Sequence, residues 1–167
     1  MKPAKAMFYR ATLIVVLLFL THGCRSDDPH REGRNSDVQF AVLQTFDSLA
    51  QAIRSLNVAA MLTFYSTDSS IVRALDGRLV AGRAAVERDF REGFAAVRSI
   101  DRLDVMARHL AVLSPESAVL TVQADEAFTD TAAGVTRVRA TWTSAWRLQS
   151  GHWRIIQDAA VHVPVGH

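Results

Sequence analysis

The chain has 167 residues, 49% of them hydrophobic and 22% charged, a composition typical of one globular domain and not of a disordered chain. The formal net charge is +2. Three of the 19 basic residues, Lys2, Lys5 and Arg10, lie in the first 23 residues, which hold no acid, so the remainder balances 16 arginines against 17 acidic residues. Because the chain after residue 23 is so close to neutral, its charge gives no reason to expect a nucleic-acid partner. The single cysteine excludes an internal disulfide and a zinc site built on paired cysteines, and we predict no metal and no cofactor.

Residues 1–23 have the features of a signal peptide. The basic residues precede an uninterrupted apolar run, residues 11–20, which is too short to span a bilayer. Gly23 directly precedes Cys24, and this stretch resembles the lipobox in which bacterial lipoproteins are acylated. We therefore expect a lipid on Cys24 and a location on a membrane of the bacterial cell envelope. An ordinary secretory signal, giving a secreted or periplasmic soluble protein, is the alternative.

Three further segments make up the rest of the chain. Residues 25–35, RSDDPHREGRN, contain no apolar residue apart from Pro29, so with Cys24 they predict a solvated tether over residues 24–35. Residues 36–163 form one domain without internal repeats. Residues 164–167 are left as a tail.

The first half of the domain predicts three helices and a hairpin. Ser36 and Gln39 have the spacing of a capping box, and apolar residues then recur every three or four positions. Asn57 is expected to cap a second, short helix, and Asp76-Gly77 is a strong signal for a hairpin joining residues 69–75 and 78–81. A third helix follows Gly82. Its apolar face includes Val86 and Phe90, and its charged residues, Arg83 and Asp89 among them, lie largely on the other face.

From residue 99 onward the apolar period changes from helical to two. The pattern predicts four strands, at 99–113, 117–129, 135–148 and 152–163, and the turns between them are short enough to require antiparallel neighbours. One face of the third strand carries Val138, Ala140, Trp142, Ser144, Trp146 and Leu148. The prediction is therefore an α+β fold in the order ααββαββββ, with its helices gathered on one face of a curved, mainly antiparallel sheet.

Three local patches agree with this order of elements. They are FYSTD at residues 64–68, GRAAV at 82–86 and GHWRII at 151–156. With them, residues 36–163 resemble the nuclear transport factor 2-like superfamily, in particular its SnoaL-like and ketosteroid-isomerase-like branch. The resemblance implies a cone-shaped fold with a deep apolar pocket between the helices and the concave face of the sheet. It also implies that the chain could form a homodimer.

Aromatic residues are the first candidates for this pocket. Trp142 and Trp146 would lie on its sheet wall, and Tyr65, Leu49 and Phe90 on its helical side. The alternative is that these side chains simply fill the core. A pocket of this kind would suit a small hydrophobic ligand.

The resemblance also allows the isomerase chemistry to be tested. The three catalytic positions of a ketosteroid isomerase fall on Arg73 for the base, on Leu49 for the tyrosine and near Ala140 for the acid. None of these residues fills its role, and a guanidinium is not a base at neutral pH. Isomerase activity of that type is therefore not expected.

Arg73 and Glu126 share the parity of apolar neighbours on their strands, so both are predicted to point inward. Two inward charges suggest either an Arg73–Glu126 ion pair or an arginine that meets an anionic ligand; the alternative places both at a solvated cone mouth. The predicted ligand-binding residues are Tyr65, Arg73, Glu126, Trp142 and Trp146. The predicted function is binding of a small molecule or a protein partner without catalysis. The alternative is a cofactor-free lyase, hydrolase or isomerase that uses Glu126 with Tyr65 or Asp158.

Overall fold

The computed structural model describes residues 29–165. The predicted signal peptide and Cys24 lie outside the described residues. The chain divides into two units, Met1–Glu32 and Gly33–His167, and the second unit contains the sheet and the hydrophobic core. Within residues 29–165, every helix is too short or too polar to cross a membrane.

The first described helix, α2 (Pro29–Arg54), begins well before Ser36. Residues 29–35 of the predicted polar tether are helical, so the predicted N-cap is wrong: Ser36 lies inside the helix. Proline is tolerated in the first turn, where its missing N–H has no helical partner. This polar segment continues, toward the N-terminus, the amphipathic part of the helix, in which Val42, Phe46 and Leu49 are buried.

The other predicted helices and the hairpin are confirmed. The Asn57 side chain accepts a hydrogen bond from the Ala60 amide and caps α3 (Val58–Leu62). Strands β1 (Val72–Leu75) and β2 (Arg78–Ala81) are antiparallel. The turn between them, Asp76-Gly77, has positive φ at both residues, which the twist of a two-residue hairpin requires. Helix α4 (Arg83–Ala95) follows.

The four predicted strands of the meander are also confirmed. They are β3 (Val97–Ser114), β4 (Ser117–Asp130), β5 (Val135–Gln149) and β6 (His152–Pro164). All six strands form one sheet in the order β2-β1-β6-β5-β4-β3. Strand β1 pairs in parallel with β6, so β6, the last described strand, lies in the interior of the sheet, between the hairpin and β5.

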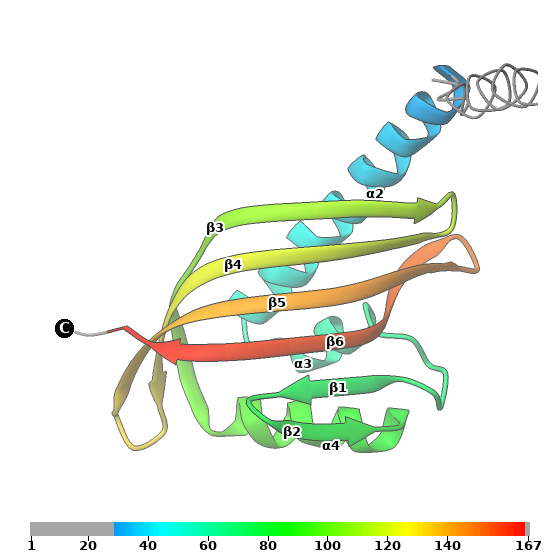
Figure 1. The fold of residues 1–167 in the computed structure, drawn as a ribbon. Helices are drawn as coiled ribbons and strands as arrows, with labels where there is room; N and C mark the ends of the chain where they lie inside the picture. The colour runs from blue at the N-terminus through cyan, green and yellow to red at the C-terminus, as the bar shows by residue number, and fades with distance from the viewer. Residues whose placement is uncertain (1–28, 166–167) are drawn as a thin grey trace, which may run out of the picture. The chain divides into compact units, whose positions relative to one another are not determined.

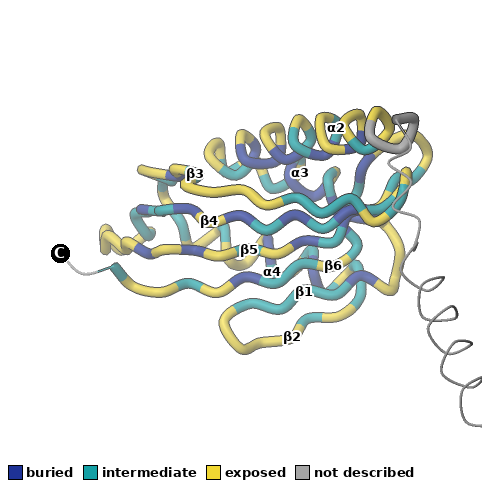
Figure 2. The backbone as a smooth tube through the Cα atoms, turned by 45° about the horizontal axis from the view of Figure 1, so that its top comes forward, coloured by how far each residue is buried: buried dark blue, intermediate teal, exposed yellow. Residues whose placement is uncertain are grey.

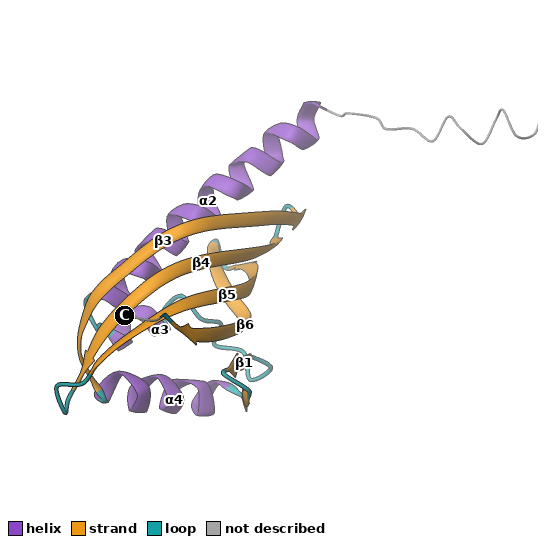
Figure 3. Cartoon of the chain, turned by 60° about the vertical axis from the view of Figure 1, so that its left-hand side comes forward, coloured by secondary structure: helices purple, strands orange, loops and turns teal. Residues whose placement is uncertain are grey.

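The sheet is curved, and the helices cover its concave face (Figures 1 and 3). Burial alternates along the central strands (Figure 2), with Leu120 and Val122 of β4 buried against Val42 and Phe46 of α2 in one core. The predicted inward face of β5 is confirmed, because Ala140 and Trp146 are buried there while the alternate arginines are exposed. The fold is thus α+β, with three described helices on a six-stranded open sheet.

Candidate functional site

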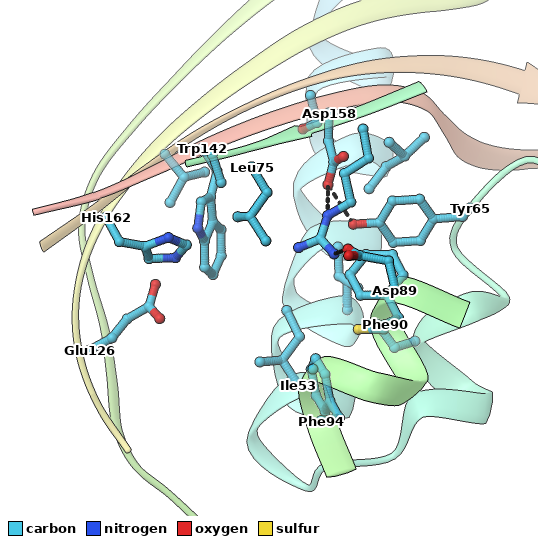
Figure 4. Close-up of a pocket in the computed structure, with 18 of the residues that line it drawn as sticks. Ile53, Tyr65, Leu75, Asp89, Phe90, Phe94, Glu126, Trp142, Asp158 and His162 are labelled. Atoms are coloured by element: carbon cyan, nitrogen blue, oxygen red, sulfur yellow. Dashed lines mark hydrogen bonds and ion pairs between the residues drawn. The ribbon is translucent and has the colours of Figure 1, made fainter. Parts of the chain in front are cut away.

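A cavity of about 240 Å³ lies between the three helices and the concave face of the sheet. Its walls are mainly apolar, with Phe46 and Leu49 from α2, Phe90 from α4 and Trp142 from β5. Polar side chains form two separate groups on this apolar background (Figure 4). A concave apolar site with a few convergent polar groups is the usual form of a small-molecule site.

The first polar group, here called the inner cluster, consists of Tyr65, Arg73, Asp89 and Asp158. The Tyr65 hydroxyl donates a hydrogen bond of 2.8 Å to Asp158 Oδ2. Arg73 Nη1 donates to Asp89 Oδ2 at 2.7 Å, and its Nε lies 3.8 Å from Asp158 Oδ2. Figure 4 shows these contacts as dashed lines. Segments far apart in the sequence therefore meet in one ionic network.

Aromatic rings hold this network in place. The Arg73 guanidinium carbon lies 3.8 Å from the centre of the Phe90 ring, close enough for a cation–π contact. Tyr65 packs edge-on against the same ring, with centroids 4.9 Å apart. Phe90 thus fixes both the cation and the hydroxyl donor of the inner cluster.

The position of Tyr65 is set by backbone contacts. Tyr65 forms an isolated parallel bridge with Ile155 of β6, and the Ser66 amide donates to the Ile155 carbonyl at 2.8 Å. The Arg83 guanidinium donates to the carbonyls of Leu62, Tyr65 and Ser66 at 3.0–3.2 Å. Arg83, expected on the charged outer face of its helix, therefore anchors the segment that presents Tyr65.

A register shift in β6 turns Asp158 into the cavity. Ala145 pairs with Gln157, whereas Trp146 pairs with Ile155, so Ile156 is an extra residue in the ladder. Before this bulge the odd-numbered residues Trp153 and Ile155 are buried. After it, the even-numbered residues Asp158 and His162 line the cavity. Without the bulge, simple alternation would direct Asp158 outward.

The second polar group, here called the outer group, consists of Asp76, Glu126 and His162. His162 Nδ1 lies 2.9 Å from Asp76 Oδ2, and its backbone amide donates to Asp76 Oδ1 at 2.8 Å. Glu126 of β4 faces His162 across the cavity (Figure 4). The His162 and Asp76 side chains are 25% and 46% exposed, against 14% for Asp158 and 13% for Arg73. The outer group therefore lies at the more open end.

Burial changes the acidity of both groups. It raises the pKa of Glu126 from the ordinary 4.5 to about 7, an effect that His162 opposes and the Asp76 charge reinforces. Burial also raises the pKa of Asp158, although the Arg73 guanidinium and the Tyr65 hydroxyl pull it back. The pKa of Tyr65 lies well above 10, chiefly because the phenol is buried. Two carboxyls that hold protons more tightly than usual thus face one apolar cavity.

Four of the five predicted ligand-binding residues, Tyr65, Arg73, Glu126 and Trp142, line this cavity. The fifth, Trp146, does not: it is 1% exposed in the core, and its indole N–H donates to Ser144. The position is inward as predicted, but its ring is enclosed by the core. Leu49 and Phe90, the other helical-side candidates, both line the cavity.

The Arg73–Glu126 ion pair, one of the alternatives that the sequence left open, does not form. Arg73 is paired with Asp89 and Asp158, while Glu126 belongs to the outer group. The charged neighbours of Asp89 predict a place on the solvated face of its helix, yet Asp89 lines the cavity. It lies beside Phe90 at the edge of the apolar stripe, and this proximity to an inward aromatic is the signal that could have marked it. Among residues 29–165, histidine and acidic side chains form no cluster that could hold a metal ion.

Residues 42–163 match the family model of the SnoaL-like domain, and the chain belongs to this family. No curated protein matches the chain. Solved structures of low sequence identity share the fold. A provisionally assigned scytalone dehydratase from Novosphingobium aromaticivorans is 10% identical, with a TM-score of 0.70 over 79% of this chain and 88% of that one. A provisionally assigned dehydratase of the nuclear transport factor 2-like family from Streptomyces avermitilis is 15% identical, with a TM-score of 0.67 over 78% and 99%.

Proposed function

We propose that this domain binds a small, mostly apolar ring compound in the cavity and that the inner cluster holds one polar group of that compound. The observation that carries the proposal is a buried hydrogen-bonding cluster set into an otherwise apolar, aromatic-lined cavity. Asp158 Oδ1 is buried and has no hydrogen-bond partner among the described residues. It is therefore placed to accept a hydrogen bond from a ligand.

Binding without isomerase chemistry is favoured by the state of Arg73. This residue occupies the position of the isomerase base, and its guanidinium is tied to two carboxylates and stacked on Phe90. An arginine held in this way shapes and polarises the inner end of the cavity. It does not remove protons.

Calorimetric titration with two matched probes tests the proposal. 2-Naphthol donates a hydrogen bond, and its methyl ether does not. We expect both to bind with 1:1 stoichiometry and the naphthol to bind about tenfold more tightly, because a hydrogen bond to a charged group contributes about 1.5–3 kcal/mol. In Asp158→Asn this preference should fall at least threefold, since a neutral acceptor is weaker. The control is Asp47→Asn, which changes an exposed residue outside the cavity. Absence of binding by both probes would contradict the proposal.

A second candidate is a cofactor-free enzyme, a lyase, hydrolase or isomerase. It is favoured by two carboxyls of raised pKa, Asp158 and Glu126, at the two ends of one cavity, because such carboxyls suit general acid–base catalysis near neutral pH. Ligands found by the titrations would be followed for turnover by NMR. Conversion that is lost in Asp158→Asn or Glu126→Gln, while binding persists, would favour the enzyme. A bound ligand that stays unchanged for days would favour the binding protein.

We also propose that the protein is anchored in the bacterial envelope through a lipid on Cys24. Support comes from the sequence alone, from the basic start, the short apolar run and Gly23-Cys24. Cys24→Ser should move the protein from the membrane fraction to the soluble fraction. Intact mass spectrometry should show a mature chain that begins at a lipid-modified Cys24, and an unmodified thiol in the mature protein would contradict the anchor.

A further inference from the structure

We propose that the outer group is a second ligand subsite and that it receives a protonated amine. The inference deepens the proposed function and rests on it: the ligand would be an apolar ring compound with an amine at one end and a neutral hydrogen-bonding group at the other. The outer group would bind the amine through Glu126, while the inner cluster takes the neutral group.

The balance of charge in the cavity supports a cation. The charged or titratable residues of its lining, apart from Tyr65, are Arg73, Arg78, Asp89, Glu126, Asp158 and His162. The lining therefore holds three carboxyls against two arginines, so one carboxyl has no arginine to compensate it. Asp76, bound to His162, adds another at the same end. The two arginines are already engaged, since both contact Asp89.

Glu126 is the residue on which this uncompensated charge falls. Its Oε1 is buried and makes no hydrogen bond to any residue of the described chain. A buried carboxylate without a partner is costly, and a cation beside it removes that cost through a charge-assisted hydrogen bond. Burial of this carboxyl is also the main reason why the pKa of Glu126 is raised to about 7.

Neighbouring side chains complete the subsite. His162 is oriented by Asp76, whose carboxylate accepts a hydrogen bond from Nδ1. The Trp142 ring lies between the outer group and the inner cluster (Figure 4), and indole faces attract cations. The subsite thus offers a carboxylate and an aromatic face, which together suit an ammonium group.

The spacing of the two subsites sets the length of the ligand. Asp158 and His162 are four residues apart on β6, which corresponds to about 13 Å along a strand. A ligand that reaches both is about the length of two fused rings with a substituent at each end. The same charge balance argues against the anionic ligand that an unpaired Arg73 would have favoured.

Three naphthalene derivatives that differ only in the charge of one substituent test this inference by calorimetry. They are 2-(aminomethyl)naphthalene, a cation, 2-naphthalenemethanol, which is neutral, and 2-naphthoate, an anion. At pH 8 we expect the amine to bind at least tenfold more tightly than the alcohol, and the carboxylate to bind most weakly. Between pH 6 and pH 8 the affinity for the amine should rise as Glu126 ionises, whereas the affinity for the alcohol should stay constant.

Glu126→Gln should abolish most of the preference for the amine and leave binding of the alcohol within about twofold. Asp125→Asn is the matched control, because Asp125 neighbours Glu126 on β4 and pairs with Arg139 away from the cavity lining. Equal affinities for amine and alcohol, or an amine preference that survives Glu126→Gln, would overturn the inference and leave the proposed function intact. Failure of all three probes to bind would instead count against the proposed function.

Discussion

Tyr65 and Asp158 are 93 positions apart in the chain and are joined by a hydrogen bond of 2.8 Å inside the cavity. The bond connects the segment after α3 to the last strand. It also affects the pKa of Asp158. The phenol donates to the ionised carboxylate and so lowers this pKa, whereas burial raises it.

Tyr65→Phe should therefore raise the pKa of Asp158 further. The substitution keeps the ring on Phe90 and removes only the hydroxyl donor. The shift can be followed by titrating the carboxyl carbon resonances by NMR. Asp125, which lies outside the cavity lining and is paired with Arg139, serves as an internal control and should titrate as before. An unchanged Asp158 titration would mean that the hydrogen bond is absent in solution.

Glu126→Gln should stabilise the protein in alkaline solution. Below about pH 4.5 the carboxyl is protonated in both states and has no effect on stability. Between pH 4.5 and 7 the folded chain keeps a proton that the unfolded chain releases, so the free energy of unfolding falls as pH rises. Above about pH 7 the free energy of unfolding has fallen by its full amount, roughly 3 kcal/mol. Urea unfolding of both proteins at pH 5 and pH 8 measures the difference, and parallel pH profiles would contradict it.

Trp146→Ala should destabilise the fold by about 3–5 kcal/mol, the range for removing a large buried aromatic side chain. Trp146 is enclosed in the core and its N–H is bonded to Ser144. Trp142→Ala should cost less, because one side of that ring borders the cavity. Denaturant unfolding followed by far-ultraviolet circular dichroism compares the two. A larger loss of stability in Trp142→Ala than in Trp146→Ala would show that Trp146 borders the cavity.

Arg83→Gln should lower the free energy of unfolding by about 2 kcal/mol, because it removes charged hydrogen bonds to three backbone carbonyls. Arg91→Gln is the control on the same helix. It breaks only an exposed contact with Glu87, which should contribute less than about 1 kcal/mol. Similar losses in the two variants would assign Arg83 an ordinary surface role.

The elements of this fold could be predicted from local patterns, because each has a local cause. Asn57 caps a helix, Asp76-Gly77 supplies the positive φ angles of a hairpin, and a period of two marks each strand. The beginning of α2 could not be predicted in this way. Nothing in residues 29–35 requires a helix, and the helical state arises as an extension of the amphipathic segment that comes after it.

The candidate site could be predicted only in part. Strand parity correctly indicates that Arg73 and Glu126 point inward, but it carries no information about the partner of a charge. Arg73 meets Asp89 because β1 lies beside α4 in space, and the contact joins residues of different elements. The inward direction of Asp158 depends on the bulge at Ile156, a register shift that no residue type announces.

The central position of β6 has a consequence for synthesis. The ribosome makes β6 after the other five strands of the sheet, yet β1 and β5 both need it as a neighbour. The β1–β2 hairpin and strands β3–β5 therefore remain separate, each with an unpaired edge, until β6 has been made. Because β6 also supplies Asp158 and His162 to the cavity lining, a nascent chain has no complete site. A chain truncated before β6 would lack both the complete site and the strand that joins β1 to β5.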